Sequence, residues 1–310
     1  MSRGLVAGVI AAAMLGGTVF LVARTATTAA AADVDATVEY GGRLLRETAK
    51  LIGPDQADPA LRYAGSRLNC SSCHFDGGAV PGTLSLRQTA SRYPRPSPRD
   101  GGVRDLRDRI NGCMLRSMNG RALPRDGAEM IAMEKYIQHL GEQPPTGSPQ
   151  PPEQAPFKEP DRAADPEAGR AVYAARCTVC HGAGGLGLLT TGKPSDGYTF
   201  PPLWGADSFN DGAGMHRVLT AATFIKARMP LGQADLTDDQ AFDVAAFINS
   251  QPRPAMQGLE RDYPDLAAKP VDNPYPPYVD PFPQERHVYG PFKEIRAWYA
   301  ARKASQPGAQ

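Results

Sequence analysis

The sequence predicts an all-α protein made of two domains. Apolar residues recur at helical spacing in several segments, whereas the alternating patterns typical of β-strands are almost absent. The pentapeptide Cys-x-x-Cys-His occurs twice, beginning at Cys70 and at Cys177, with a proline-rich stretch between the copies. A length of 310 residues is also typical of two domains. One copy of the pentapeptide therefore falls in each domain.

The first domain is expected to span residues 33–142. Helical spacing predicts helices from about Val38 to Leu51, from Val103 to Met118 and from Ala128 to Leu140. Residues 143–160 follow and contain seven prolines, a composition that disfavours helix and favours an extended spacer. We interpret this stretch as the linker between the domains.

The second domain is expected at residues 161–253, and both of its ends carry helix signals. Asp165 and Pro166 have the types of an N-cap and a first helical residue, and Thr237 begins a capping box with Gln240. Residues 254–310 are rich in proline, tyrosine and aspartate. They predict an extension that wraps the globular body in extended conformation and ends in a short helix from about Phe292 to Arg302.

The N-terminal residues 1–32 have the composition of an export segment. Residues 4–23 carry no charge and precede an alanine-rich stretch, so a cleaved signal peptide and an uncleaved membrane anchor both fit. Either would place the rest of the chain in the periplasm, free or tethered to the inner membrane by residues 4–23.

The two pentapeptides are expected to bind two covalently attached c-type haems. In each, two thiols one helical turn apart can add to the vinyl groups of haem, and the following histidine can bind the iron. A zinc site would need the two pairs to join in one tetrahedron, which their separation in the sequence disfavours. The residues concerned are Cys70, Cys73 and His74 in the first domain, and Cys177, Cys180 and His181 in the second.

The second iron needs a sixth ligand, and Met229 is the residue that we favour. It follows a helical stretch and precedes the capped last helix of its domain, and a thioether ligand raises the reduction potential. Lys226 and His216 are the competing ligands, although we expect His216 on a helix surface. Met229 as a plain core residue is the other alternative.

In the first domain, Cys113 is distinguished from other candidate ligands by its surroundings. Ten arginines, three aspartates and no lysine or glutamate occur between Arg87 and Arg125, in a chain of net charge +1. Arginine binds oxyanions through parallel hydrogen bonds, so this segment predicts a site for small anions. The other candidate ligands are Met114, Met118, Met130, Met133 and His139.

Arg109 and Arg116 lie four residues before and three after Cys113, which predicts that both share its helix face. Positive charge at that distance favours the thiolate, the form that binds metals and acts as a nucleophile. The alternatives are an inert buried cysteine and a disulfide between chains.

Several segments resemble the di-haem, tetrathionate-forming thiosulfate dehydrogenases of the TsdA type. The resemblance extends over the exported body of the chain and is carried by residues 109–120 (RINGCMLRSMNG), 200–205 (FPPLWG), 208–214 (SFNDGAG), 224–232, 269–272 and 289–292.

This resemblance implies that His74 and Cys113 bind the iron of an active-site haem, with Arg99, Arg109 and Ser117 lining the substrate pocket. The haem of His181 would transfer electrons to a periplasmic cytochrome c or another acceptor. The substrate would be thiosulfate and the product tetrathionate. Some members have a lysine before the methionine that exchanges with it as ligand, where this chain has Arg228.

Other functions remain as alternatives. A SoxA-type cytochrome would load sulfur onto a carrier protein, and a plain di-haem carrier would use the arginines as a docking face. A di-haem peroxidase is disfavoured because Cys113 would close the open iron site that it needs. The near-neutral net charge, without a basic run that contains aromatic residues, disfavours nucleic-acid binding.

Overall fold

The computed structural model describes residues 34–143 and 155–305. The expected export segment and most of the expected linker lie outside these ranges. Within them, no helix is both long and apolar enough to cross a membrane.

The described part of the chain is mainly helical, which confirms the all-α prediction. Residues 34–46 form its first described helix. The further helices are α2 (Thr48–Ile52), α3 (Leu106–Arg116), α4 (Ala128–Glu142), α5 (Pro166–Arg176), α6 (Thr178–His181), α7 (Val218–Arg228), α8 (Asp238–Asn249), α9 (Gln284–Tyr289) and α10 (Lys293–Ser305).

Two short antiparallel hairpins were not predicted. They pair β1 (Arg95–Ser97) with β2 (Gly102–Arg104), and β3 (Leu188–Leu189) with β4 (Tyr198–Phe200). The first hairpin explains why the helix expected from Val103 begins only at Leu106. Asp105 is its N-cap and forms a capping box with Asp108, so the residues before it are free to pair as strands.

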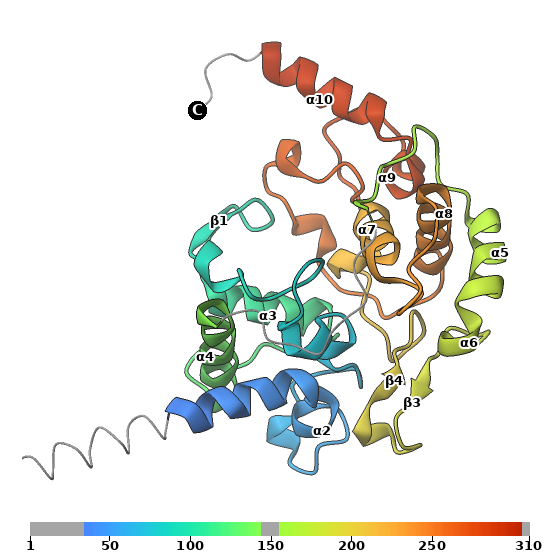
Figure 1. Cartoon of the computed structure of the whole chain (residues 1–310). Coiled ribbons are helices and arrows are strands. Elements are labelled where there is room, and N and C mark those ends of the chain that lie inside the picture. The colour runs from blue at the N-terminus through green and yellow to red at the C-terminus, as the bar shows by residue number, and fades with distance from the viewer. Residues whose placement is uncertain (1–33, 144–154, 306–310) are drawn as a thin grey trace, which may run out of the picture.

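Two hydrophobic cores are present, one on each side of the molecule (Figure 1). The first joins helix 34–46 to α3 and α4 through side chains that include Leu44, Ile110 and Met130. The second joins α5, α7 and α8 around Phe242. The two expected caps of the second domain are confirmed, since Asp165 caps α5 and Thr237 forms its box with Gln240.

The C-terminal extension runs back over the body before it reaches α10 (Figure 1). Residues 250–283 contain only two 3₁₀ turns, in agreement with the expected extended wrap. The short helix α9 was not predicted, because the six residues from Gln284 to Tyr289 are too few to show a helical period.

Candidate active site

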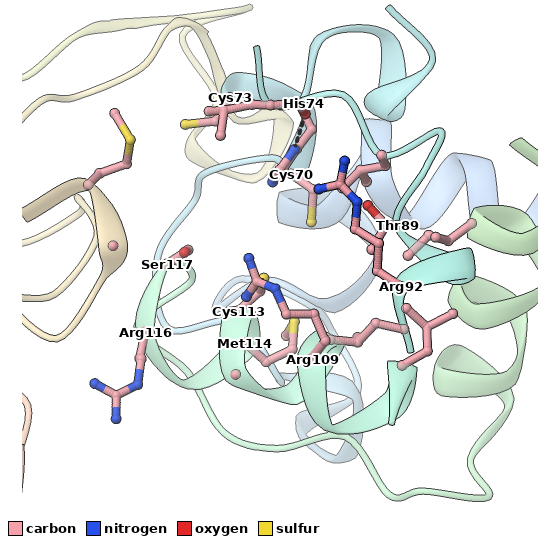
Figure 2. Close-up of a pocket in the computed structure, with 18 of the residues that line it drawn as sticks. Cys70, Cys73, His74, Thr89, Arg92, Arg109, Cys113, Met114, Arg116 and Ser117 are labelled. Atoms are coloured by element: carbon pink, nitrogen blue, oxygen red, sulfur yellow. Dashed lines mark hydrogen bonds between the residues drawn. The ribbon is translucent and has the colours of Figure 1, made fainter. Parts of the chain in front are cut away.

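A cavity of about 1150 Å³ lies over the first Cys-x-x-Cys-His motif. Figure 2 shows Cys70, Cys73 and His74 on one side of this space, and Cys113 of α3 on the other. Residues from the second half of the chain, among them Met215 and Tyr263, complete the lining. The cavity is therefore built by both halves of the molecule.

Helix α3 presents Cys113 to the cavity because its opposite face is buried. Leu106, Ile110 and Met114 recur every four residues and pack into the first core, and Met114 is only 1% exposed. Arg109 and Cys113, also four residues apart, lie on the other face.

Both candidate haem histidines are held in the same way. Nδ1 of His74 lies 2.6 Å from the carbonyl oxygen of Leu84, and Nδ1 of His181 lies 2.8 Å from that of Pro201. When Nδ1 donates its proton to such a carbonyl, Nε2 is left with a lone pair that can bind a metal. Burial lowers the pKa of both rings, which keeps them neutral.

The residues around the cavity fit a covalently bound haem. The cavity exceeds the roughly 300–1000 Å³ of a typical small-molecule pocket. All five cysteines lie in the described ranges and none forms a disulfide. Burial raises the pKa of Cys70, Cys73 and Cys177 to about 11, so these thiols stay protonated until they react.

Arg109 and Cys113 are in direct contact. Nη1 of Arg109 lies 3.1 Å from the sulfur of Cys113, as their shared helix face predicts. The pKa of Arg109 is raised, chiefly by the charge of the Cys113 sulfur. A guanidinium at this distance stabilises a thiolate more than a thiol.

Arg116 takes a different direction from the one expected. Its guanidinium points away from Cys113 (Figure 2) and donates to Asp262 at 2.8 Å and to the Gly212 carbonyl at 3.0 Å. Arg99 donates to the other oxygen of Asp262 at 2.7 Å. Burial lowers the pKa of Arg116, and the charge of Arg99 adds to this effect. Asp262 thus binds Arg99, which the resemblance assigned to the substrate pocket, and Arg116, which was expected beside Cys113.

Asp262 and Arg92 are two site residues that the sequence did not single out. Asp262 belongs to the C-terminal extension and has no motif around it, so only the fold places it beside α3. Arg92 is one of the ten clustered arginines, and its guanidinium points into the cavity towards Cys70 (Figure 2). Ser117, the C-cap of α3, also lines the cavity.

The other sulfur ligands considered for the first iron are largely buried. Met114, Met118 and Met133 line the cavity but belong to the first core, where each is at most 3% exposed. Met130 and His139 are not in the cavity lining. Cys113, in contrast, is partly exposed and carries a cationic partner.

The second motif lies in different surroundings. Val179, between Cys177 and Cys180, is 87% exposed, and Leu231, two residues after Met229, is 53% exposed. Met229 is the C-cap residue of α7 and packs against the second core.

The competing ligands of the second domain have other partners. His216 lies in a 3₁₀ turn rather than on a helix surface, and its two nitrogens are 3.0 and 3.1 Å from the carbonyl oxygens of Asp211 and Asn249. Nζ of Lys226 donates to the Leu236 carbonyl at 2.7 Å. Within the described residues, Met229 is therefore the candidate whose metal-binding atom has no hydrogen bond to give up.

Comparison with known proteins agrees with this arrangement of two sites. The family model of the SoxA/TsdA cytochrome c domain matches residues 64–145, and that of the cbb3-type cytochrome c oxidase subunit III matches residues 164–248. The chain is therefore a c-type cytochrome with two cytochrome c domains, and haem c is the cofactor of such domains.

Sequence relatives show to which family of c-type cytochromes the chain belongs. Thiosulfate dehydrogenase from Allochromatium vinosum is 43% identical to this chain, in an alignment that covers 63% of this chain and 73% of the relative. The enzyme from Psychrobacter arcticus is 40% identical and covers 65% of this chain and 61% of the relative. The enzyme from Stutzerimonas stutzeri is 39% identical and covers 69% and 68%. The chain belongs to the thiosulfate dehydrogenase family.

A solved structure is similar as well. Thiosulfate dehydrogenase (TsdBA) from Marichromatium purpuratum matches with a TM-score of 0.61 and 35% identity, over 72% of this chain and 47% of that one. The chain thus spans about half of that structure, and about 61% of the Psychrobacter protein.

Proposed function

We propose that this protein couples two thiosulfates oxidatively to tetrathionate at the cavity above the first motif. The contact between Arg109 and Cys113, 3.1 Å long and opposite His74, is the observation that carries the proposal. A sulfur nucleophile with a cationic partner, facing a haem-binding histidine, suits the oxidation of an anionic sulfur compound.

Two haems are proposed, one at each motif. At the first, Cys70 and Cys73 would hold the haem covalently, and His74 and Cys113 would bind its iron. At the second, Cys177 and Cys180 would hold the haem, and His181 and Met229 would bind its iron. When bound, the haems supply the chemistry of one-electron acceptance and transfer.

Cys113 would act as the nucleophile. Its thiolate would form an S–S bond with the outer sulfur of one thiosulfate, a two-electron oxidation for which the two bound haems would supply the electron acceptors. The outer sulfur of a second thiosulfate then attacks the sulfur bound to Cys113. The new S–S bond completes tetrathionate, and the bond to Cys113 breaks with return of its electron pair to the thiolate.

The arginines would offset the repulsion between two dianions. Arg109 and Arg92 reach the cavity, while Arg99 and Arg116 are held at its edge by Asp262. These two arginines and one carboxylate keep a net charge of +1. Fixed positive charge in a partly enclosed site favours the approach of anions and the charge that accumulates in the transition state.

The proposed reaction also requires an electron acceptor outside the protein. The electrons would leave through the second haem to a periplasmic cytochrome c or another acceptor. Residues 1–32 would direct export, and residues 4–23 would serve as a signal core or a membrane anchor.

The decisive experiment mixes oxidised, haem-loaded protein with thiosulfate. Haem reduction accompanied by one tetrathionate for every two electrons supports the proposal. Reduction that needs a sulfur carrier protein would favour a SoxA-type role, and the absence of any substrate chemistry would favour a plain electron carrier.

A further inference from the structure

Arg228 directly precedes the proposed ligand Met229, yet its side chain reaches into the first half of the molecule. It is the last residue of α7 and only 6% exposed. Its Nη2 donates to the carbonyl oxygen of Pro81 at 2.6 Å. Pro81 belongs to the loop after the first haem motif and lines the cavity.

An aromatic contact reinforces this connection. Phe75 directly follows His74, and its ring centroid lies 6.0 Å from that of Phe224 on α7. The guanidinium carbon of Arg228 is 6.0 Å from the centre of the same Phe75 ring. One turn of α7 therefore contacts Phe75 through both an aromatic ring and a cation.

The loop that receives these contacts is itself firmly held. Its ends are joined because Nδ1 of His74 lies 2.6 Å from the Leu84 carbonyl. Asp76 accepts a hydrogen bond from Arg46 at 3.0 Å. Its tight path needs positive φ angles at Asp76, Gly77, Gly78, Gly82 and Leu84. A displacement of Pro81 would therefore move His74 as well.

We infer that Arg228 is a positioning residue that fixes the Met229 end of α7 against the His74–Leu84 loop. His74, which would bind the first iron, and Met229, which would bind the second, then belong to one rigid unit. Arginine suits this role because its planar guanidinium can donate to Pro81 and lie near Phe75 at once, and it does not bind iron. The inference rests on the proposed ligation of the second haem by Met229.

The test uses the haem-loaded protein without thiosulfate. Arg228→Ala removes the hydrogen bond to Pro81 and the cation–π contact with Phe75. Arg228→Gln keeps an N–H donor for Pro81 but loses the charge. Arg170→Ala is the matched control, because Arg170 is an exposed arginine of the same domain that pairs only with Glu167 among the described residues. Two quantities are measured: the methionine-to-iron charge-transfer band, and the rate at which electrons equilibrate between the haems after photoreduction.

Arg228→Ala should weaken the methionine band and slow equilibration by about tenfold, because small displacements of reacting groups have large effects on rate. Arg228→Gln should lose less, and Arg170→Ala should match the parent protein. Phe75→Leu removes the aromatic ring but keeps the hydrogen bond from Arg228 to Pro81, and it should also slow equilibration. This variant replaces Arg228→Ala in the test if Arg228→Ala does not fold.

An unchanged band and an unchanged rate in Arg228→Ala, or in Phe75→Leu if that variant must serve, would overturn the inference. Absence of the methionine band from the parent protein would overturn it too, because Met229 would then not be the ligand. Failure of the parent protein to form tetrathionate, with the band and the variant effects present, would refute the proposed reaction and leave this inference supported.

Discussion

The two Cys-x-x-Cys-His motifs share a local design and differ in what surrounds them. Both histidines have a backbone carbonyl at Nδ1. The first motif faces a cavity with Cys113 and Arg109 on its far side, whereas the second has the 87% exposed Val179 within it and Met229 as the candidate ligand. In the proposed function, each motif attaches a haem, and the residues that face the motif make the first site catalytic and the second an electron-transfer site.

Charge distinguishes the two regions further. The first cavity is lined by several arginines, and the carboxylate of Asp262 pairs with two of them, which leaves a net positive charge. Near the second motif, Arg176 pairs with Asp235. An anionic substrate would therefore be drawn to the first site and not to the second.

The largest expected effect comes from removing Cys113, the cysteine that faces the first motif across its cavity. Cys113→Ala should reduce thiosulfate oxidation by a factor on the order of 10³ or more, because the nucleophile is lost. Tetrathionate formation measures this, with haem content as a check on folding. Leu115→Ala, at a 38% exposed position of the same helix, is the matched control. Retention of more than a tenth of the activity in Cys113→Ala would contradict the covalent step.

Loss of the cationic partner should have the next largest effect. Arg109→Gln removes the charge 3.1 Å from the Cys113 sulfur and should lower turnover about 100-fold, as the loss of one preorganised donor does elsewhere. Arg107→Gln is the control, because Arg107 lies on the same helix and pairs with Glu134. Equal losses in both variants would show that general charge, rather than this contact, matters.

A change at Met229 should affect the second site alone. Met229→His should lower the potential of one haem by on the order of 100 mV, within the roughly 0.8 V that axial ligands span. A potentiometric titration would show one shifted and one constant midpoint. Met256→Leu, a methionine of the extension, should shift neither. A Met229→His protein with both midpoints unchanged would exclude Met229 as ligand.

The smallest effect concerns a histidine of the second half that we do not assign to iron. Burial, and then the charge of Arg253, lowers the pKa of His216 to about 4. The unfolded chain binds this proton near pH 6.5. The stability contributed by neutral His216 is therefore present above pH 6.5 and is lost as the pH falls towards 4.

We expect the free energy of unfolding to fall by about 2 kcal/mol more between pH 7 and pH 5 in the parent protein than in His216→Gln. Urea denaturation at the two pH values, followed by circular dichroism, measures the difference. Parallel pH dependences would mean that His216 is not held neutral in the fold.

Much of the architecture could be predicted because its signals are local. The caps at Asp165 and Thr237 and the helix from Ala128 depend on residues within a turn of one another. The contact of Arg109 with Cys113 follows from helical spacing for the same reason. Spacing alone could not predict Arg116, because its direction depends on Asp262, which is 146 residues away.

His216 illustrates the same limit. Its expected helix surface depended on local pattern, whereas its real environment is made by Asn249 of α8 and Tyr275 of the extension. The positions of Arg228 and Phe75 likewise need the docking of α7 on the loop of the first motif.

The part played by the C-terminal extension has a consequence for biogenesis. Tyr263, Ala268 and Pro270 line the cavity, and Asp262 ties this segment to α3. The wall is therefore completed by residues that are synthesised after both motifs. A nascent chain that has reached only Arg253 contains both motifs but lacks Asp262, Tyr263 and Pro270, so its first pocket is open on that side and Cys70 and Cys73 are more accessible than in the finished fold.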